Sequence, residues 1–491
     1  MKSAIVIATI DRAISAAALG ALPPGVTWLE VRADLAGPID AHWLRQHFSG
    51  RLLYALRTSD LSADARRERI LQAARDYDFV ELETRDLAEA ILAAIPPEKR
   101  VLAWHGAACT NGELASRLAE LSSHEARMVR IAVRAQRPAE ELAPLTLLRS
   151  AGRHDVAAYA EGPSAMWTRI AALQLGSPAV FGSVADDVES DGIPSAAQLV
   201  ADYGLPFVHP AAELFAIAGN PVYRSLSPRL HNSAFRILGR PSLYVPFHVT
   251  NFDDFWQAVV ARDTLDVLGL PLRGMCVVSP YKEVAHDQAG ATTYFVRQAA
   301  AANYVSRDRD GVWTAHTTDP EGVLLPLRDR GVEPASHRVA VVGCGGSGRA
   351  IAAALVKAGA GVTLVNRGLE RGALAARLLH LPFIPLSKFS TDDFSIVINA
   401  TPLGRDGQSL PFLVDPARKD IVVVDLVYGM KPTPLVAAAR MAGQVTIDGV
   451  DVLLAQVRSQ FQLMTGDEMP SGVADRVAHI QPRREIAAQT R

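Results

Sequence analysis

The chain has 491 residues, of which 49% are hydrophobic and 21% charged, and its formal net charge is −2. Because a domain typically spans roughly 100 to 200 residues, this length predicts about three domains. The charge is spread without runs, so nothing indicates nucleic acid or an anionic membrane as a partner. No uninterrupted apolar run reaches the roughly 18 residues that a membrane-spanning helix needs.

The cysteines and the N-terminus predict a reducing, cytoplasmic location. Cys109, Cys276 and Cys344 are far apart and odd in number, which favours neither a disulfide framework nor a metal cluster. In MKSAIVIATIDR a short apolar stretch is soon followed by Asp11 and Arg12. This pattern is typical of a first strand rather than of a signal peptide.

Short apolar runs recur through the first 207 residues, roughly 20 to 30 residues apart, with helix-like stretches such as SADARRERILQAARDY between them. The runs are SAIVIAT, TWLEVR, LLYALR, DFVELE, VLAWH, RMVRIAV, DVAAYA and PAVFGSV. Eight strand-and-helix units predict a parallel (β/α)8 barrel, with any site at the carboxyl ends of its strands.

The rhythm restarts after two prolines in YGLPFVHPAAELFAIAG, which places a boundary at about residue 208. We expect an α/β domain over 213–325, completed by a C-terminal helix at about 449–475, and a second α/β domain over 326–448. The C-terminal segment DGVDVLLAQVRSQFQLM has apolar residues at helical spacing.

A glycine turn opens the second of these domains. Gly343, Gly345 and Gly348 follow the strand VAVV and precede an alanine-rich helix. Such glycines let backbone N–H groups approach a pyrophosphate at a helix N-terminus. A glycine turn without a ligand is the alternative.

The next strand, GVTLV, ends in Asn366 and Arg367, where an NAD enzyme would place a carboxylate. An arginine there favours a 2′-phosphate, and Arg371 follows one helical turn later. The cofactor is therefore predicted to be NADP, although Arg371 alone also fits an exposed helix arginine.

Three polar clusters precede this domain: GNPVYRSLSP with Ser225 and Ser227, SPYKE with Lys282, and HTTDPEG with Asp319. A lysine close to a carboxylate can exchange a proton with a substrate alcohol during hydride transfer. On composition alone, an exposed surface lysine is the more common interpretation of Lys282.

Residues 213 to about 475 resemble shikimate dehydrogenase throughout their length. The family's motifs occur in order as GNPVYRSLSPRLHN, SPYKE, AAANYV, TTDPEG, GCGGSGRA, NR, NATPLG, DLVYGMKPTPL and GVDVLLAQ. The resemblance implies a Rossmann NADP-binding domain and reversible NADPH-dependent reduction of 3-dehydroshikimate to shikimate in a cleft between two domains.

The resemblance also implies residue roles, with Lys282 and Asp319 as the catalytic pair. It assigns substrate contacts to Ser225, Ser227, Asn303, Tyr428 and Gln456. It assigns cofactor contacts to Gly343, Cys344, Gly345, Gly346, Ser347, Gly348, Asn366, Arg367, Arg371, Asn399, Thr401, Leu426 and Gly449.

Two positions depart from the family's pattern. The family's NVT reads CVV, so Val278 stands where a substrate-contacting threonine is usual, and NTD reads TTD, with Thr317 in place of an asparagine. A lost polar contact costs about 1 to 3 kcal/mol if its partner stays unpaired. Quinate, which shares the ring and carboxylate, is therefore an alternative substrate.

The first 205 residues resemble type I 3-dehydroquinate dehydratase. The resemblance rests on EVRAD, ALRTS, AWH, VRIAV, MWTRIA and VFGSV, which contain Glu30, Arg32, Asp34, Arg57, His105, Arg130 and Arg169. The two families occur fused in this order in a bifunctional enzyme of the shikimate pathway, a precedent that does not by itself show activity.

The barrel lacks the family's Schiff-base lysine, because VKIA reads VRIA and places Arg130 at that position. A guanidinium stays protonated and cannot form an imine. Lys2 and Lys99 are the only other lysines before Lys282, and neither ends a predicted strand. The family's GQ also reads GI with Ile193, and Leu61 stands at an acidic position.

The altered barrel has two interpretations. Its polar residues form either a vestigial anion-binding pocket or buried ion pairs retained for stability. These residues are Glu30, Arg32, Arg57, His105, Arg130 and Arg169.

The sequence thus predicts a shikimate dehydrogenase fused to a degenerate barrel, with a small-molecule substrate and no metal. The alternatives are a bifunctional enzyme that dehydrates 3-dehydroquinate without an imine, a quinate or shikimate dehydrogenase, and a regulator that binds NADPH or pathway acids without turnover.

Overall fold

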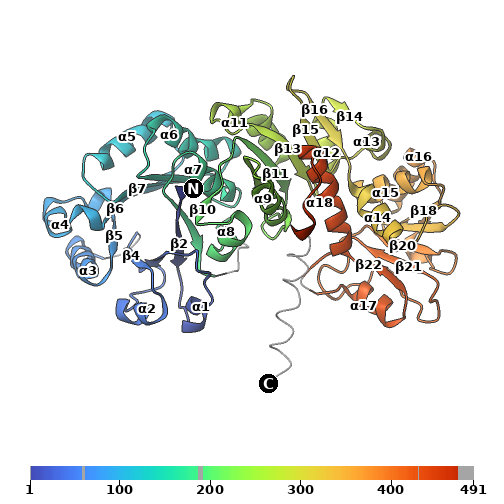
Figure 1. The fold of residues 1–491 in the computed structure, drawn as a ribbon, viewed down its shortest axis with the longest axis horizontal. Coiled ribbons are helices and arrows are strands. Elements are labelled where there is room, and N and C mark those ends of the chain that lie inside the picture. Colours follow the sequence, from blue (N-terminus) through green and yellow to red (C-terminus); the bar gives the residue numbers. More distant parts are fainter. Residues whose placement is uncertain (1, 58–60, 186–191, 430, 474–491) are drawn as a thin grey trace. The chain divides into compact units, whose positions relative to one another are not determined.

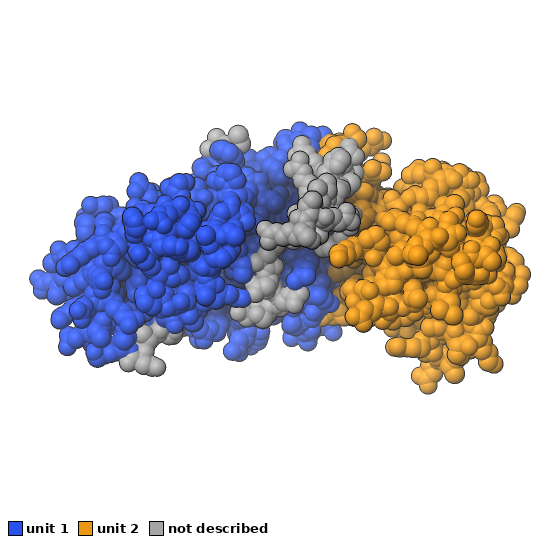
Figure 2. Space-filling model, turned by 90° about the horizontal axis from the view of Figure 1, so that it is seen from below, with its two compact units in different colours: residues 1–272 blue, residues 273–491 orange. Residues whose placement is uncertain are grey.

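The computed structural model describes residues 2–57, 61–185, 192–429 and 431–473. The chain divides into two compact units, residues 1–272 and residues 273–491, coloured separately in Figure 2. Both units alternate strands and helices, as the sequence predicts. Within the described ranges, no helix is long and apolar enough to cross a membrane.

All eight predicted barrel strands are confirmed. Each pairs in parallel with its neighbour, and the order β8-β7-β6-β5-β4-β3-β2-β9 makes the last strand a partner of the first, in a nearly closed barrel. The strands are β2 (Ile5–Ile10), β3 (Trp28–Arg32), β4 (Arg51–Ala55), β5 (Phe79–Glu83), β6 (Arg100–Ala107), β7 (Met128–Arg134), β8 (Val156–Glu161) and β9 (Ala179–Ser183).

Helices follow the barrel strands and lie around them (Figure 1). The stretch predicted as helical, SADARRERILQAARDY, forms α3, and Ser62 caps it by accepting a hydrogen bond from the Ala65 N–H. The helices are α1 (Ala16–Gly20), α2 (Ala41–His47), α3 (Ala63–Asp76), α4 (Glu89–Ala94), α5 (Asn111–Ser122), α6 (Ala143–Ala151), α7 (Met166–Gln174) and α8 (Ala196–Tyr203), with 3-10 turns η1 (Thr84–Asp86), η2 (Pro97–Lys99) and η3 (Pro138–Leu142).

Apolar side chains fill the part of the barrel beneath its carboxyl ends. Trp28 stacks on Phe79 with ring centroids 4.0 Å apart, and Ile7, Leu53 and Val101 belong to the same buried cluster. Strands covered on both faces read as continuous apolar runs, which is why all eight are visible in the sequence.

The first unit continues beyond the barrel. Strand β1 (Lys2–Ser3) pairs with β10 (Phe207–Val208), and β11 (Glu213–Gly219) pairs in parallel with β12 (Ser242–His248) on either side of α9 (Ser227–Leu238). The unit ends with α10 (Phe252–Phe255), the π-helix η4 (Trp256–Val260) and α11 (Thr264–Val267).

The barrel packs against this following segment within the first unit. The Trp167 ring of α7 meets the Phe247 ring of β12 with centroids 5.1 Å apart. Arg229 of α9 donates to Asp202 of α8 at 2.7 Å, and Tyr223 donates to the Pro163 carbonyl at 2.8 Å. Apolar and polar contacts therefore join the two parts.

At the start of the second unit, β13 (Leu272–Val277) pairs antiparallel with β15 (Tyr304–Arg307), and β15 pairs antiparallel with β16 (Trp313–His316). Strand β14 (Ala291–Thr292) pairs in parallel with β16. Helices α12 (Lys282–Gln288), α13 (Tyr294–Ala299) and α14 (Asp319–Asp329) alternate with these strands.

A six-stranded parallel sheet follows in the order β19-β18-β17-β20-β21-β22. Its strands are β17 (Arg338–Val342), β18 (Gly361–Asn366), β19 (Phe383–Pro385), β20 (Ile396–Asn399), β21 (Val422–Asp425) and β22 (Val445–Ile447), connected by α15 (Gly346–Lys357), α16 (Leu369–Leu379), η5 (Leu386–Lys388) and α17 (Pro434–Met441). The order reverses between β17 and β20, the switch point at which Rossmann folds bind dinucleotides.

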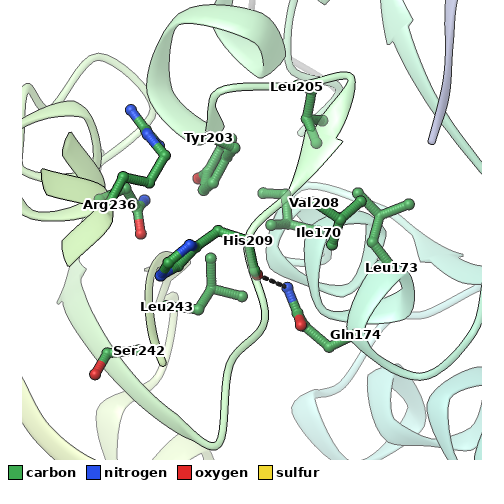
Figure 3. A pocket seen from close by; sticks show the side chains of 11 residues that line it. Ile170, Leu173, Gln174, Tyr203, Leu205, Val208, His209, Arg236, Ser242 and Leu243 are labelled. Carbon is green, nitrogen blue, oxygen red and sulfur yellow. Dashed lines mark hydrogen bonds between the residues drawn. The ribbon is translucent and has the colours of Figure 1, made fainter. Parts of the chain in front are cut away.

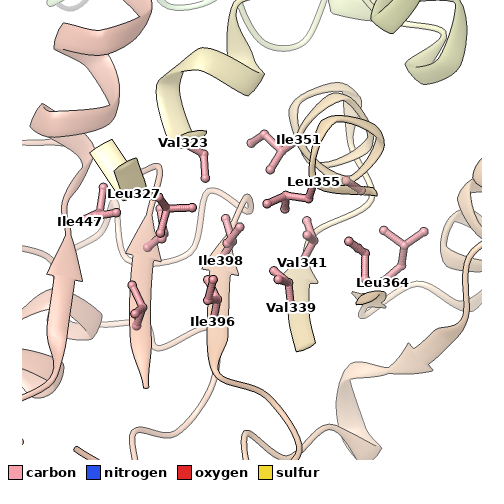
Figure 4. Packing of buried hydrophobic residues seen from close by; sticks show 14 of the residues in the cluster. Val323, Leu327, Val339, Val341, Ile351, Leu355, Leu364, Ile396, Ile398 and Ile447 are labelled. Carbon is pink, nitrogen blue, oxygen red and sulfur yellow. The ribbon is translucent and has the colours of Figure 1, made fainter. Parts of the chain in front are cut away.

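A buried apolar layer supports this sheet on one face. Val341 and Ile398 project from neighbouring strands toward Ile351 of α15 and Leu327 of α14, as Figure 4 shows. This layer fixes α15, and with it the glycine turn, against β17.

The last helix is shorter than the sequence predicts. Helix α18 (Gly449–Thr465) starts at a capping box of Asp448 and Asp451 and ends at Gly466, whose φ of 76° is left-handed. A glycine in this conformation terminates helices. The expected range of about 449–475 is therefore too long, and its last two residues lie outside the described part of the chain.

Candidate active site

Lys282 and Asp319 form an ion pair in the second unit. The Lys282 Nζ lies 2.9 Å from Oδ1 and 2.7 Å from Oδ2 of Asp319. Each is the first residue of its helix, α12 and α14 respectively. The Asp319 side chain is only 3% exposed and that of Lys282 17%, so this lysine is not the exposed one of the alternative interpretation.

Two further groups complete the surroundings of the pair. Gln456 of α18 donates to Asp319 Oδ1 at 2.9 Å, and Ser347 Oγ of α15 accepts from Lys282 Nζ at 2.7 Å. Helix α18 can approach because Gly322 of α14 has no side chain; a Cβ there would lie 2.7 Å from Gln456 Cγ. Four helices thus meet at one amine and one carboxylate.

Asn303, a predicted substrate contact, belongs to a buried network beside this pair. Its Oδ1 accepts from the Thr318 N–H at 2.8 Å, and its Nδ2 donates to Thr318 Oγ1 at 3.0 Å. Gln460 donates to the same hydroxyl at 3.1 Å. The network fixes the residue that immediately precedes Asp319.

The other predicted substrate contacts are described by their own surroundings. Ser225 Oγ accepts from the Ser227 N–H at 3.2 Å, and both serines belong to the first unit, at the start of α9. Tyr428 follows β21 with 38% of its surface exposed, and Val278 follows β13. Of the predicted substrate contacts, Gln456 hydrogen-bonds to the ion pair directly, at Asp319.

The glycine turn has the close backbone packing that a dinucleotide site requires. Gly343 has a φ of 110°, which disfavours any side chain, and a Cβ on Gly348 would lie 1.9 Å from the Gly343 carbonyl oxygen. A Cβ on Gly346 would lie 3.2 Å from Lys282 Cβ. The turn therefore fits a pyrophosphate at the N-terminus of α15 and also lies against the lysine.

The second cofactor motif places its two arginines differently. Asn366 Oδ1 accepts from the Cys344 N–H at 3.1 Å, which ties β18 to the turn. Arg367 is exposed, and no ion pair is found for it among the described residues. Arg371 instead lies 2.9 Å from Glu283 Oε1.

Glu283 was not singled out from the sequence, although it follows Lys282 in SPYKE. It also pairs with Arg349 of α15 at 2.8 Å. Burial opposes its charge, but the hydrogen bonds and charges of Arg349 and Arg371 prevail and lower the pKa of Glu283. The adjacent lysine and glutamate in SPYKE are the sequence feature that could have pointed to Glu283.

The other predicted cofactor residues form the adjacent rim. Asn399 is fully buried and donates to Asp425 Oδ1 at 2.8 Å, while Thr401 donates to Asn399 Oδ1 at 2.6 Å. Leu426 N–H donates to the Asn399 carbonyl at 3.0 Å. A Cβ on Gly449 would lie 2.3 Å from the Val427 carbonyl oxygen, so α18 can start there only with glycine.

In the barrel, Arg130 is 2% exposed and surrounded by acceptors. Its Nη1 donates to Glu30 Oε1 and, at 2.9 Å, to Glu81 Oε2, and its Nε donates to Tyr159 at 2.7 Å. The guanidinium also lies over the Phe181 ring, 3.5 Å from its centroid. The cation in RMVRIAV is therefore paired with two carboxylates and a hydroxyl.

The same cluster contains a second arginine and a histidine. Arg57 donates to Glu30 at 2.6 Å and to Glu81 at 2.8 Å, and His105 Nε2 lies 3.2 Å from Glu81. Glu81 was missed in the sequence. A buried cation within an apolar strand needs a carboxylate nearby. Glu81 in the apolar run DFVELE could have been recognised from the sequence as such a partner.

Burial and ion pairing act in opposite directions on these charges. Burial would raise the pKa of Glu30, but the guanidinium groups of Arg130 and Arg57 outweigh it and lower that pKa to about 2. Burial would lower the pKa of Arg130, which the carboxylates raise well above its ordinary value. At neutral pH the Arg130 guanidinium is therefore protonated and offers no nucleophilic nitrogen.

A cavity of about 430 Å³ opens above this cluster, at the carboxyl ends of the strands. Its lining includes the guanidinium groups of Arg32, Arg57, Arg130, Arg134 and Arg169 and the carboxylates of Asp11, Glu30 and Glu161. Arg32 pairs with Asp34 at 2.8 Å, and Arg169 lies 4.1 Å from the Tyr159 ring centroid. The ion pairs of Arg57 and Arg130 thus lie at the floor of this cavity.

A smaller cavity of about 20 Å³ lies beside α7, where Gln174 donates to the His209 carbonyl at 3.0 Å (Figure 3). Leu173, Val208 and Leu243 also line it. Its volume suits about one water molecule and not a metabolite.

Comparison with known proteins places both parts of the chain. A shikimate dehydrogenase (NADP(+)) from Acidiphilium cryptum is 37% identical over 260 residues, which cover 52% of this chain and 91% of the relative. The chain belongs to the shikimate dehydrogenase family. A second such relative, from Moorella thermoacetica, is 34% identical over 277 residues, covering 54% of this chain and 92% of the relative.

The family models agree with this division. Residues 217–305 match the shikimate dehydrogenase substrate binding domain, and residues 12–209 match type I 3-dehydroquinase. The structure of dehydroquinate dehydratase and shikimate dehydrogenase from S. pombe AroM aligns with 97% of this chain and 98% of that chain at 20% identity, with a TM-score of 0.44. Both resemblances seen in the sequence are confirmed.

Two alanine substitutions in the glycine turn of this shikimate dehydrogenase family member separate its packing from its contact with the cofactor. We expect Gly348→Ala to lower protein stability by about 1 to 3 kcal/mol, because its Cβ meets the Gly343 carbonyl. Gly345 has a φ of −76° and room for a Cβ. We therefore expect the Gly345→Ala variant to unfold near the wild-type temperature and to bind NADPH more weakly. Thermal unfolding and fluorescence titration measure the two effects; equal stability of both variants would contradict the packing argument.

The buried carboxylates predict an acid-sensitive barrel. The folded pKa of Glu30, about 2, lies below its ordinary value of 4.5, so its contribution is complete above pH 4.5 and is lost as the pH falls toward 2. This contribution is on the order of 3 kcal/mol. We expect the urea midpoint to fall over this range, less steeply in Glu30→Gln than in the exposed control Glu98→Gln. Parallel curves for the two variants would refute the assignment.

Proposed function

We propose that this protein is an NADP-dependent shikimate dehydrogenase that reversibly reduces 3-dehydroshikimate to shikimate in chorismate biosynthesis. The supporting observation is the Lys282–Asp319 ion pair, held beside a glycine turn that fits a dinucleotide. A regulator without turnover would have no need for this pair.

The residues divide the chemistry as follows. NADPH, when bound, supplies the hydride. Lys282 carries the proton that the substrate oxygen gains on reduction and loses on oxidation. Asp319 accepts two hydrogen bonds from the ammonium and so fixes it, while Gln456 fixes Asp319. The turn at 343–348 holds the pyrophosphate, and exposed Arg367 selects the 2′-phosphate.

Substrate recognition is proposed to involve Ser225, Ser227 and Tyr428 at the carboxylate and Gln456 at a ring hydroxyl. The Asn303 amide is engaged with Thr318, so a substrate hydroxyl would have to share that amide. The Val278 side chain offers no hydrogen bond to a substrate. This loss supports quinate as a second substrate to be compared with shikimate.

Replacing the lysine tests the proposal. We expect Lys282→Ala to lower kcat about 10²- to 10⁴-fold, because no neighbouring group replaces its proton. Nicotinamide absorbance with shikimate or quinate and either NADP or NAD measures the change. The exposed Lys388→Ala should retain wild-type rates. Undiminished turnover in Lys282→Ala would contradict the assignment, and faster turnover with quinate would change the substrate.

For the barrel we propose that the imine-dependent dehydration of 3-dehydroquinate is lost. Arg130 is protonated, buried and paired with two carboxylates, so no amine is present at the position where the related enzymes place one. The alternative is a bifunctional enzyme that binds 3-dehydroquinate in the cavity above Arg130 and dehydrates it without a covalent intermediate.

Chemical trapping distinguishes these possibilities. After incubation with 3-dehydroquinate and borohydride, we expect the intact protein to keep its original mass, because only an imine is reduced to a stable adduct. Mass spectrometry provides the measurement. An added mass that maps to the barrel would show that our interpretation of Arg130 is wrong.

The wider assignments are also proposals. The division into a barrel at 1–207, a substrate-binding domain at 213–325 with α18, and a cofactor domain at 326–448 follows from the motif order. The even charge balance supports a small-molecule substrate without nucleic-acid or membrane partners, and the scattered cysteines support a cytoplasmic location.

A further inference from the structure

The hydroxyl of Ser347 links two motifs that the sequence treats as separate. Ser347 is the second residue of α15, at the end of the glycine turn, and its Oγ lies 2.7 Å from Lys282 Nζ. The residue was predicted only as a cofactor contact. Its position also places it next to the amine proposed to carry the proton.

The hydrogen bonds of the Lys282 ammonium are fully used. An ammonium has three N–H donors. Two are directed to Oδ1 and Oδ2 of Asp319, at 2.9 and 2.7 Å, and the third acceptor is Ser347 Oγ. Asp319 holds the amine from α14 and Ser347 from α15, so the long lysine side chain is fixed from two helices.

The backbone brings the two motifs together before the side chains do. A Cβ on Gly346 would lie 2.8 Å from Ala301 Cβ and 3.2 Å from Lys282 Cβ, so a glycine lets the turn approach the lysine. The Ala302 N–H donates to the Lys282 carbonyl at 2.8 Å on the same side. The serine contact therefore rests on a tightly packed backbone.

We propose that Ser347 is a positioning residue for Lys282, which orients the amine for proton transfer and ties it to the cofactor-binding turn. This proposal rests on the proposed dehydrogenase function. Ser347 acts through the lysine: its hydroxyl accepts one hydrogen bond from the ammonium and so restricts the direction of the amine.

Replacing Ser347 by alanine removes one neutral acceptor and leaves Asp319, the charged partner of the amine, in place. A change in kcat without a change in KM can then be assigned to that acceptor.

The test compares Ser347→Ala, Ser347→Thr and the exposed control Ser387→Ala in the full chain. We expect Ser347→Ala to lower kcat about tenfold while the KM values for shikimate and NADP stay near those of the wild type, because the amine loses an acceptor that orients it. Ser347→Thr keeps a hydroxyl and should restore kcat, and Ser387→Ala should match the wild type. Thermal unfolding of each variant verifies its fold.

Other outcomes overturn the proposal. An unchanged kcat in Ser347→Ala, with or without a raised KM for NADP, would make Ser347 at most a cofactor contact. A defect that Ser347→Thr does not repair would show that the hydroxyl is not the cause. Both results leave the dehydrogenase assignment intact, which fails instead if Lys282→Ala stays active.

Discussion

The ion pair between Lys282 and Asp319 is the contact at which four helices of the second unit meet. A charged amine and a carboxylate that is 3% exposed must stay together, because separating them would leave a buried charge without a partner. Four helices supply the groups that keep them in place, and small residues at Gly322 and Gly346 let those helices approach. The glycine turn, Lys282 and the C-terminal helix α18 are thereby held together by direct contacts.

The barrel follows the same electrostatic rule with a different result. Two guanidinium groups, from Arg57 and Arg130, face two carboxylates, from Glu30 and Glu81, with no net charge among the four. A lysine at Arg130 would be one cation with a proton to lose. The arginine keeps the charge balance of this floor but has no amine that could act as a nucleophile.

Much of this arrangement could be predicted from the sequence. The eight barrel strands are buried on both faces and read as apolar runs, and the glycine turn has a strand before it and a helix after it. The partners of Arg130 could not be predicted, because Glu30 and Glu81 are distant in the chain and only barrel closure brings them near. The contact between Ser347 and Lys282 depends on helix packing, which no local pattern encodes. Gly466 could have predicted the end of α18, because a glycine after an amphipathic helix often terminates it in the left-handed conformation.

The packing of the barrel on the segment that follows it bears on how the chain can be divided. Trp167 and Asp202 contribute to that surface from the barrel side, and Phe247 and Arg229 from the other. Cutting the chain after residue 207 would expose an aromatic face and leave a buried carboxylate without its cation. The barrel is therefore part of the folded unit formed by residues 1–272, and its packing contributes to the stability of the segment that follows it whether or not its own cavity is catalytic.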